Sequence, residues 1–272
     1  MARGQVTLSP HALTYLCEHY DLNLHPMVRV GRMPRGADED QTRQALERGR
    51  RELIDRRLLD GQDLDPFVGD AIHLLARPPV AVGVAVRSEE GTSFNAVLVE
   101  HGRSTVQAYQ ADGEDAEQVT DLHLTRHEFG GPSGNAVNLL GRLPQSQGQS
   151  ASVPSELIDR MAQRLRDHPS GGIQAALSAA GVKRADAQVL AKVFTAKRTS
   201  DAVLTVQSYD DKVRRTHRLP FNLQIFVTEE GGYFSQKKPD GNGREWTTVA
   251  PADGRKISTK LEEMASYLVG PR

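Results

Sequence analysis

The chain is poor in the features that point to secretion, membrane insertion or redox chemistry. Its 272 residues contain one cysteine, Cys17, so no intrachain disulfide and no cysteine-based zinc site can form. Cys17 lies among apolar residues, and we expect a small buried side chain rather than a nucleophile. No stretch approaches the ~20 apolar residues of a membrane-spanning helix, and the first residues lack the apolar core of a signal peptide. We therefore expect a cytoplasmic protein without membrane insertion.

Motifs for catalysis and cofactor binding are also missing. The sequence has no GxSxG nucleophile motif, no phosphate-binding loop and no HExxH pair. His123 and His127 are four residues apart in HLTRH, but they lie at the end of an expected strand, so we interpret them as surface histidines. The glycine-rich residues 129–140 fit a turn that leads into a helix. We expect no catalytic, cofactor-binding or metal-binding residues and no enzyme activity.

Hydrophobic periodicity is what the sequence has in abundance, and it predicts mixed α and β structure. Helices are expected at residues 38–60, 64–75, 130–143, 154–166, 173–180, 185–197 and 254–268. Strands are expected at residues 79–86, 93–101, 105–110, 118–124, 202–209, 218–228, 233–236 and 245–249. Between the two groups, residues 144–154 are polar and uncharged, which is typical of a linker.

The two halves of the chain repeat one order of elements: helices, then about four strands, then one helix. The hairpins at 94–113 and 221–241 both begin with Phe-Asn, turn at glycine and end in Asp-Gly. Each half alone would leave sheet edges and an apolar face uncovered. We therefore predict one domain built of half-repeats 1–143 and 152–272, joined by a linker at 144–151, with pseudo-two-fold symmetry and one shared sheet.

Several segments together resemble the EspG family. They are VTLSPHALTYL near the start, ELIDRRLLDGQDLDPFVGDAIHLLARPP before the first strands, NAVLVEHGRSTVQAYQADG in the first hairpin, and GGYFSQKKPDG and EWTTVAPADGRKISTKLEEM near the end. The order and spacing of these segments carry the resemblance, and no single motif does. The sequence departs from the family in two places: Arg57 stands where a glycine is expected, and the turn at 88–92 is short.

This resemblance implies an α+β fold, in which two helical bundles flank a central antiparallel sheet. It also implies a chaperone of actinobacterial type VII (ESX) secretion, which keeps secreted PE–PPE pairs or related ESX clients soluble and delivers them to the secretion machinery. No cofactor and no nucleic acid are expected in this role. The identity of the client and self-association of the free protein stay open.

The resemblance places the client site on the C-terminal half and on the turn at 88–92. Alternation in strand 218–228 predicts that Leu223 faces the core while Phe226 lies on the exposed face, with helix 185–197 as the other wall of a groove. The alternative is an ordinary half-exposed sheet face. The candidate client-binding residues are Glu89, Glu90, Thr92, Gln207, Asn222, Gln224 and Phe226.

A DNA-binding regulator is the alternative function. Residues 173–198 resemble a helix-turn-helix, and the second helix begins with basic Lys183 and Arg184. Leu177 replaces the usual alanine before the turn, and Asp186 follows the basic pair. The formal net charge of −1 provides no general attraction for nucleic acid. The family resemblance therefore remains the preferred interpretation.

Overall fold

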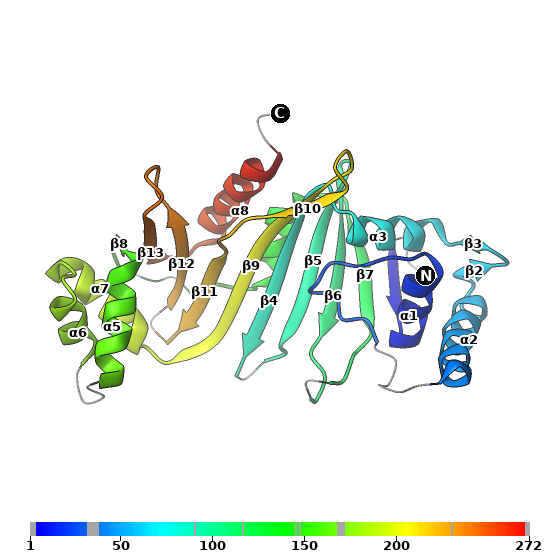
Figure 1. Cartoon of the computed structure of the whole chain (residues 1–272), viewed down its shortest axis with the longest axis horizontal. Helices are drawn as coiled ribbons and strands as arrows, with labels where there is room; N and C mark the ends of the chain where they lie inside the picture. Colours follow the sequence, from blue (N-terminus) through cyan, green and yellow to red (C-terminus); the bar gives the residue numbers. More distant parts are fainter. Residues whose placement is uncertain are drawn as a thin grey trace.

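The computed structural model describes residues 4–31, 38–89, 91–115, 117–144, 146, 148–167, 172–229 and 231–269. It has an α+β fold with a large antiparallel sheet (Figure 1). The helices are α1 (Pro10–His19), α2 (Glu39–Asp55), α3 (Pro66–Ala76), α4 (Gly131–Leu139), α5 (Ser155–Asp167), α6 (Ile173–Ala179), α7 (Arg184–Thr195) and α8 (Gly254–Val269). The strands of the first half are β1 (Gln5–Leu8), β2 (Leu59–Asp60), β3 (Asp63–Leu64), β4 (Ala81–Ser88), β5 (Phe94–His101), β6 (Ser104–Ala111) and β7 (Leu122–His127). Those of the second half are β8 (Ala151–Pro154), β9 (Arg198–Asp210), β10 (Arg215–Arg218), β11 (Leu223–Thr228), β12 (Gly231–Pro239) and β13 (Glu245–Pro251).

One sheet runs through both halves of the chain. Its strand order is β1-β7-β6-β5-β4-β9-β11-β12-β13-β8, and β10 pairs with β9 off this path. The halves meet where β4 pairs with β9, from Ala81 opposite Gln207 to Ser88 opposite Ser200. The expectation of a single sheet shared by both halves is confirmed by this pairing.

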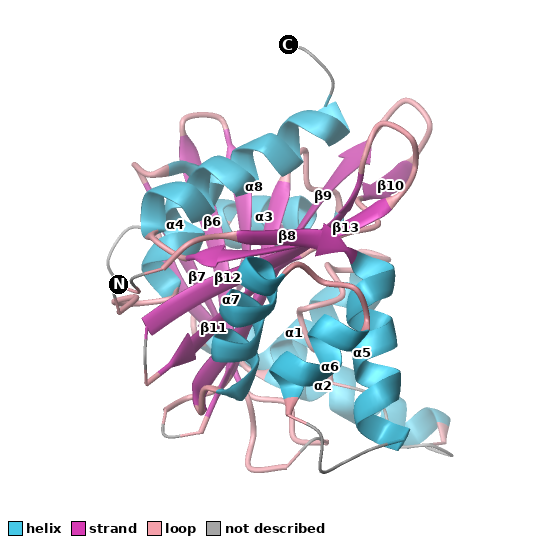
Figure 2. Ribbon diagram, turned by 90° about the vertical axis from the view of Figure 1, so that its left-hand side faces the viewer, coloured by secondary structure: helices cyan, strands magenta, loops and turns pink. Residues whose placement is uncertain are grey.

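Helices cover the two faces of the sheet differently. On one face, α4 and α8 pack against the centre, where Val84, Leu204 and Ile225 belong to one buried cluster. On the other face, α1–α3 cover the end formed by β1, β7, β6 and β5, and α5–α7 cover the end formed by β11, β12, β13 and β8. Figure 2 shows α4 and α8 on one side of the sheet, and α1, α2, α5 and α6 on the other. The middle of this second face lies between two helical bundles (Figure 1).

The sequence of β4 explains why the two faces differ. Valines at 82, 84 and 86 point to the face covered by α4 and α8, because alternate residues of a strand point to opposite sides. The residues between them are small: Ala81, Gly83 and Ala85. The face between the bundles is therefore lined at its centre by side chains that occupy little space.

The backbone at the end of α2 explains why a glycine is expected at position 57, where this chain has arginine. The N–H of Leu58 bonds to the carbonyl of Leu53, and the N–H of Arg57 bonds to that of Ile54, which together form a Schellman turn. Arg57 has φ of 56°, a left-handed conformation that favours glycine. At the end of α6, Gly181 occupies the same position of the same turn, with φ of 97°.

Some predicted boundaries were wrong. The helix expected at 38–60 ends at Asp55, and the short hairpin β2–β3 follows. The linker expected through residue 154 ends earlier, because β8 adds a strand to the sheet edge beside β13. The strand expected at 218–228 is divided into β10 and β11, since Pro220 lies between them and has no N–H to donate to a sheet.

Candidate functional site

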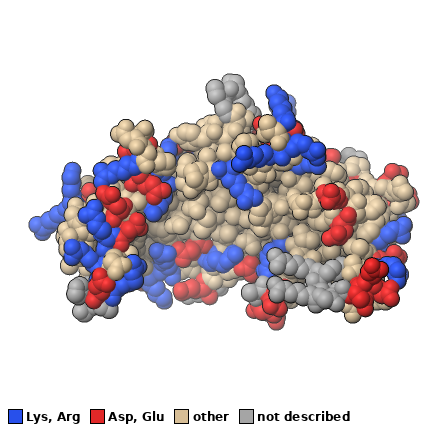
Figure 3. All heavy atoms as spheres, in the orientation of Figure 1, with Lys and Arg blue, Asp and Glu red and all other residues tan. Residues whose placement is uncertain are grey.

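The open part of the sheet between the helical bundles is the candidate site, and we call it the central groove. Its floor is a row of residues in register across three strands: Gln224 of β11, Val203 of β9 and Ala85 of β4. Gln224 is exposed, and Val203, Ala85 and the neighbouring Thr205 are half-buried. Uncharged surface occupies the middle of this view in Figure 3. The floor is therefore a shallow surface of small and polar side chains.

One wall of the groove is the segment between α1 and α2, residues 20–31, which we call the strap. It crosses the face of β5 and β6 (Figure 1). Gln110 of β6 accepts the backbone N–H of Arg29 at 2.8 Å and donates to the carbonyl of Arg29 at 3.0 Å. A Cβ atom on Gly83 would lie 2.6 Å from Met27 Sδ and 3.2 Å from His25 Cε1. Because Gly83 has no side chain, the strap can lie directly on the sheet at this position.

His25 is the buried titratable group of the strap, with 4% of its surface exposed. Its Nδ1 accepts the N–H of Met27 at 3.2 Å, and its Nε2 has no hydrogen-bond partner among the described residues. Burial lowers the pKa of His25 from 6.5 to about 4, and the nearby positive charge of Arg218 adds to this shift. The imidazole is therefore neutral at physiological pH.

The opposite wall is the bundle α5–α7, and here one prediction was wrong. Phe226, expected on the exposed face, is 3% exposed and packs in a cluster with Leu190 and Val193 of α7. Leu223 is buried on the other face, as expected. The alternation of β11 was predicted correctly, but α5–α7 cover the face that carries Phe226. The segments α6 and α7 form the expected helix-turn-helix-like unit, and Leu177 and Leu190 bury their side chains in the same cluster.

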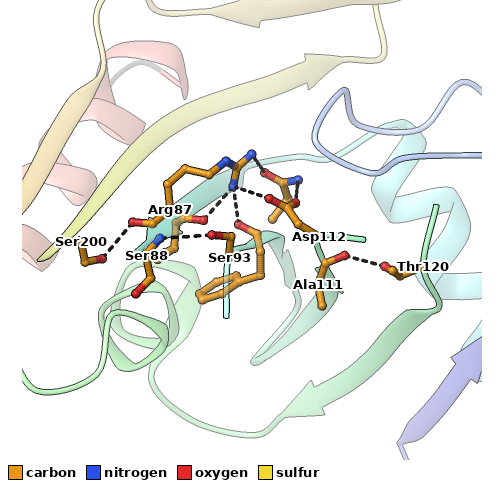
Figure 4. Close-up of polar contacts among 10 residues, drawn as sticks. Arg87, Ser88, Ser93, Ala111, Asp112, Thr120 and Ser200 are labelled. Atoms are coloured by element: carbon orange, nitrogen blue, oxygen red, sulfur yellow. Dashed lines mark hydrogen bonds and ion pairs between the residues drawn. The ribbon is translucent and has the colours of Figure 1, made fainter. Parts of the chain in front are cut away.

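Arg87 organises one end of the groove beside the β4–β5 turn (Figure 4). Its guanidinium donates to the carbonyls of Val86 at 2.7 Å and Phe94 at 3.2 Å, and to Asn95 Oδ1 at 3.2 Å. It also forms an ion pair with Asp112 at 3.5 Å. These contacts tie the ends of β4 and β5 together and to β6. A polar cavity of about 560 Å³ adjoins them, lined by Arg29, Arg87, Asn95, Asp112, Gly113, Glu114 and Asp115.

The predicted client-binding residues are distributed along the whole groove. Glu89 and Thr92 are exposed at the β4–β5 turn, and Glu90 lies outside the described residues. Asn222 is half-buried just before β11. Gln207 lies at the far end of β9, seven residues and about 23 Å from Ser200. It is only 6% exposed and accepts a hydrogen bond from Arg218 Nε at 3.0 Å.

Sequence reasoning missed Ala85, Val203 and the strap. The alternation of valine with alanine and glycine in residues 79–86 was a signal for a sheet face of small side chains, on which another segment can lie closely. No local sequence pattern predicts the position of the strap, because that position depends on contacts with β4 and β6.

The histidines of HLTRH each lie within hydrogen-bond distance of a neighbouring side chain, and Cys17 is partly buried. His123 Nδ1 lies 3.0 Å from Thr7 Oγ1, and His127 Nε2 lies 3.0 Å from Gln107 Oε1. Cys17 is half-buried, and burial with the adjacent Glu18 raises the pKa of its thiol to about 11. Within the described ranges, no three His, Cys, Asp or Glu side chains are grouped to hold a metal ion. No helix in the described part of the chain is long and apolar enough to cross a membrane.

Comparison with solved structures shows a relative with the same fold. The Mycobacterium tuberculosis type VII secretion system chaperone EspG5, solved in complex with the PE25–PPE41 dimer, has a TM-score of 0.72, and the match covers 98% of each chain at 12% identity. A match to the H959F variant of the PpsC dehydratase domain of M. tuberculosis covers 67% of this chain and 78% of that chain at 11% identity, with a TM-score of only 0.21.

Sequence comparison places the chain in a family. No curated protein sequence matches it. The EspG family model matches residues 9–263, nearly the whole chain. The chain therefore belongs to the EspG family.

Proposed function

We propose that this protein is a cytoplasmic chaperone of a type VII secretion system, and that it binds a PE–PPE dimer or a related ESX client in the central groove. The observation that carries the proposal is the open sheet face between the two helical bundles, in a chain of the EspG family. The EspG5 chaperone of the same fold was solved with a PE25–PPE41 dimer. Such a role requires a surface that covers a client and requires no catalytic residue.

The proposed contacts combine residues predicted from sequence with the floor of the groove. Gln224 and Thr205 would contact the client at the centre, and Glu89, Glu90 and Thr92 would contact it at the β4–β5 turn. Half-buried small side chains suit a reversible interface, since they expose little apolar surface when the protein is free. Asn222 and Gln207 border this surface, and Phe226 supports it from within the α5–α7 cluster.

We also propose that the groove lies on a pseudo-two-fold axis between half-repeats 1–143 and 152–272 of a single domain, joined by linker 144–151. The strand order supports this proposal: β1-β7-β6-β5-β4 in the first half matches β8-β13-β12-β11-β9 in the second. The matching Schellman turns after α2 and α6 support it further. Superposition of the two halves on backbone atoms tests the symmetry directly.

A pair of matched substitutions tests the site. Thr205→Arg places a long charged side chain on the groove floor, and Thr259→Arg places the same side chain on the exposed surface of α8, on the other face of the sheet. The PE–PPE pair encoded in the same secretion locus would be co-expressed with each variant, and affinity would be measured after purification. We expect Thr205→Arg to weaken binding at least about tenfold, equivalent to ~1.4 kcal/mol, and Thr259→Arg to leave it unchanged.

Gln224→Arg is a second groove variant, needed in case Thr205→Arg does not fold. Gln224 is exposed in the free protein, so the longer side chain should not disturb the fold. If both groove variants remain folded and bind the client as tightly as wild type, the groove is not the client site. If wild type binds neither the PE–PPE pair nor another ESX client encoded in the same locus, the chaperone function itself is wrong for this protein.

A further inference from the structure

The β9–β10 hairpin projects from the sheet at one end of the central groove. Strand β9 pairs with β11 through Leu204, and its last residues pair instead with β10, from Gln207 opposite Arg218 to Asp210 opposite Arg215. The base of the hairpin is anchored, since the N–H of Tyr209 bonds to the carbonyl of Pro78 at 2.6 Å. The Arg77 guanidinium lies 5.9 Å from the centroid of the Tyr209 ring. The base of the hairpin is therefore fixed to the sheet, and the hairpin forms a ridge beside the groove.

Positive charge is concentrated on this ridge. Lys212, Arg214, Arg215 and Arg218 are all exposed, and Figure 3 shows Lys and Arg gathered over β10. Among the described residues, none of these four side chains forms an ion pair, in contrast to exposed cations such as Arg160 and Lys237. Two carboxylates, Asp210 and Asp211, accompany them. Four basic groups and two acidic ones leave the ridge with excess positive charge.

The acidic groups of the hairpin do not neutralise its basic side chains directly. Asp210 Oδ1 accepts the backbone N–H of Lys212 at 2.8 Å and that of Val213 at 3.4 Å, so this carboxylate is engaged in closing the turn. At the tip, Val213 is 62% exposed, and Arg214 has φ of 51°. A bound partner would bury the exposed side chain of Val213. The charges of Lys212 and Arg214, on either side of it, would orient that partner.

The ridge begins at the end of the sheet face that carries Gln207. Arg218 donates from Nε to Gln207, which borders the groove floor, and the charge of Arg218 also acts on His25 of the strap. A client seated on the floor would therefore meet the hairpin at this end. Cations at the rim of an interface chiefly steer the partner and set its orientation.

We propose that the β9–β10 hairpin binds an acidic segment of the client protein and thereby orients the client in the groove. This inference rests on the proposed chaperone function and specifies the chemistry of one end of that site. An acidic protein segment fits better than nucleic acid, because the ridge is only one hairpin wide, whereas a duplex carries phosphates along its whole length. The chain as a whole has a net charge of −1 and provides no extended basic track.

The test is charge reversal at two ridge positions with a matched control. Arg214→Glu with Arg215→Glu reverses the ridge, and Arg255→Glu with Lys256→Glu makes the same change in net charge on exposed residues of α8. The probe is the purified PE–PPE pair from the same secretion locus. Association and dissociation rates are measured by surface plasmon resonance at about 50 mM and about 300 mM salt, where the screening length differs about 2.5-fold.

We expect the ridge variant to associate about tenfold more slowly than wild type at low salt, with a much smaller difference at high salt. The α8 control should follow wild type under both conditions. If the ridge variant matches wild type at both salt concentrations, or if the control slows equally, the inference is overturned while the client site stands. Absence of binding by wild type overturns the proposed function instead. Retained client binding together with loss of duplex DNA binding in the ridge variant would show that the hairpin serves nucleic acid.

Discussion

The guanidinium of Arg198 lies over the ring of Phe226, 4.8 Å from the ring centroid. Arg198 also forms an ion pair with Asp201 at 2.9 Å, and Asp201 is opposite Phe226 in the register of β9 and β11. The aromatic ring is thus enclosed by α7 side chains and a cation. Phe226 supports the groove wall and presents almost no surface to a client.

Truncation of Phe226 should therefore destabilise the protein. Phe226→Ala is expected to lower the free energy of unfolding by about 3–5 kcal/mol, because it leaves a cavity in the cluster beneath α7. Gln224→Ala, two residues earlier on the same strand face but exposed, should change it by less than about 0.5 kcal/mol. Urea denaturation monitored by circular dichroism measures both. Equal stability of the two variants would contradict the packing described for Phe226.

Two helical glycines should respond to alanine with opposite signs. A Cβ on Gly49 of α2 would overlap the carbonyl oxygen of His11 in α1, so Gly49→Ala must separate these helices and should cost about 1–3 kcal/mol. A Cβ on Gly134 of α4 meets no atom within 4 Å. Gly134→Ala should stabilise by roughly 0.5–1 kcal/mol, since alanine is the better helix former. Thermal denaturation of both variants would show the melting temperature falling in one and rising in the other.

The Schellman turn at Arg57 provides a second pair of opposite outcomes. Arg57→Gly should raise the free energy of unfolding by roughly 0.5–1 kcal/mol, because the left-handed conformation strains any residue with a Cβ. Gly181→Ala in the matching turn should lower it by about 1 kcal/mol, although there is space for the methyl group. Chemical denaturation measures both changes. A destabilised Arg57→Gly variant would mean that the arginine side chain makes a contact worth more than the backbone strain.

His25 should make stability depend on pH. Its pKa falls from 6.5 to about 4 on folding, so the unfolded chain binds the proton more tightly. The contribution of neutral His25 is complete above pH 6.5, and it decreases as the pH falls toward 4, by about 3 kcal/mol in total. His25→Asn keeps an acceptor for the Met27 N–H and cannot be protonated in this range. The difference in stability between wild type and His25→Asn, measured across this window, should therefore shift in favour of the variant at low pH. A difference that is independent of pH would contradict the buried, neutral assignment.

Much of the fold could be predicted from local patterns. Apolar spacing in α5, α7 and α8 reports a buried stripe, and alternation in β4 and β11 assigns side chains to faces, because both depend only on backbone geometry. The repeated order of elements and the unsatisfied edges of each half pointed to the shared sheet. Arg57 was recognised as a glycine position from the family pattern, and its left-handed conformation supplies the physical reason.

The site depended on contacts that no local pattern contains. The alternation placed Leu223 and Phe226 on opposite faces correctly, but whether a face meets solvent depends on which helices lie on it, and α7 covers Phe226 from a distant part of the chain. The strap lies on Gly83 through His25 and Met27, residues separated from it by more than fifty positions. The sequence alone therefore determined most of the elements, the alternation of side chains between strand faces, and the family. The tertiary structure decided which part of the sheet stays open, because burial is set by the packing of segments far apart in sequence.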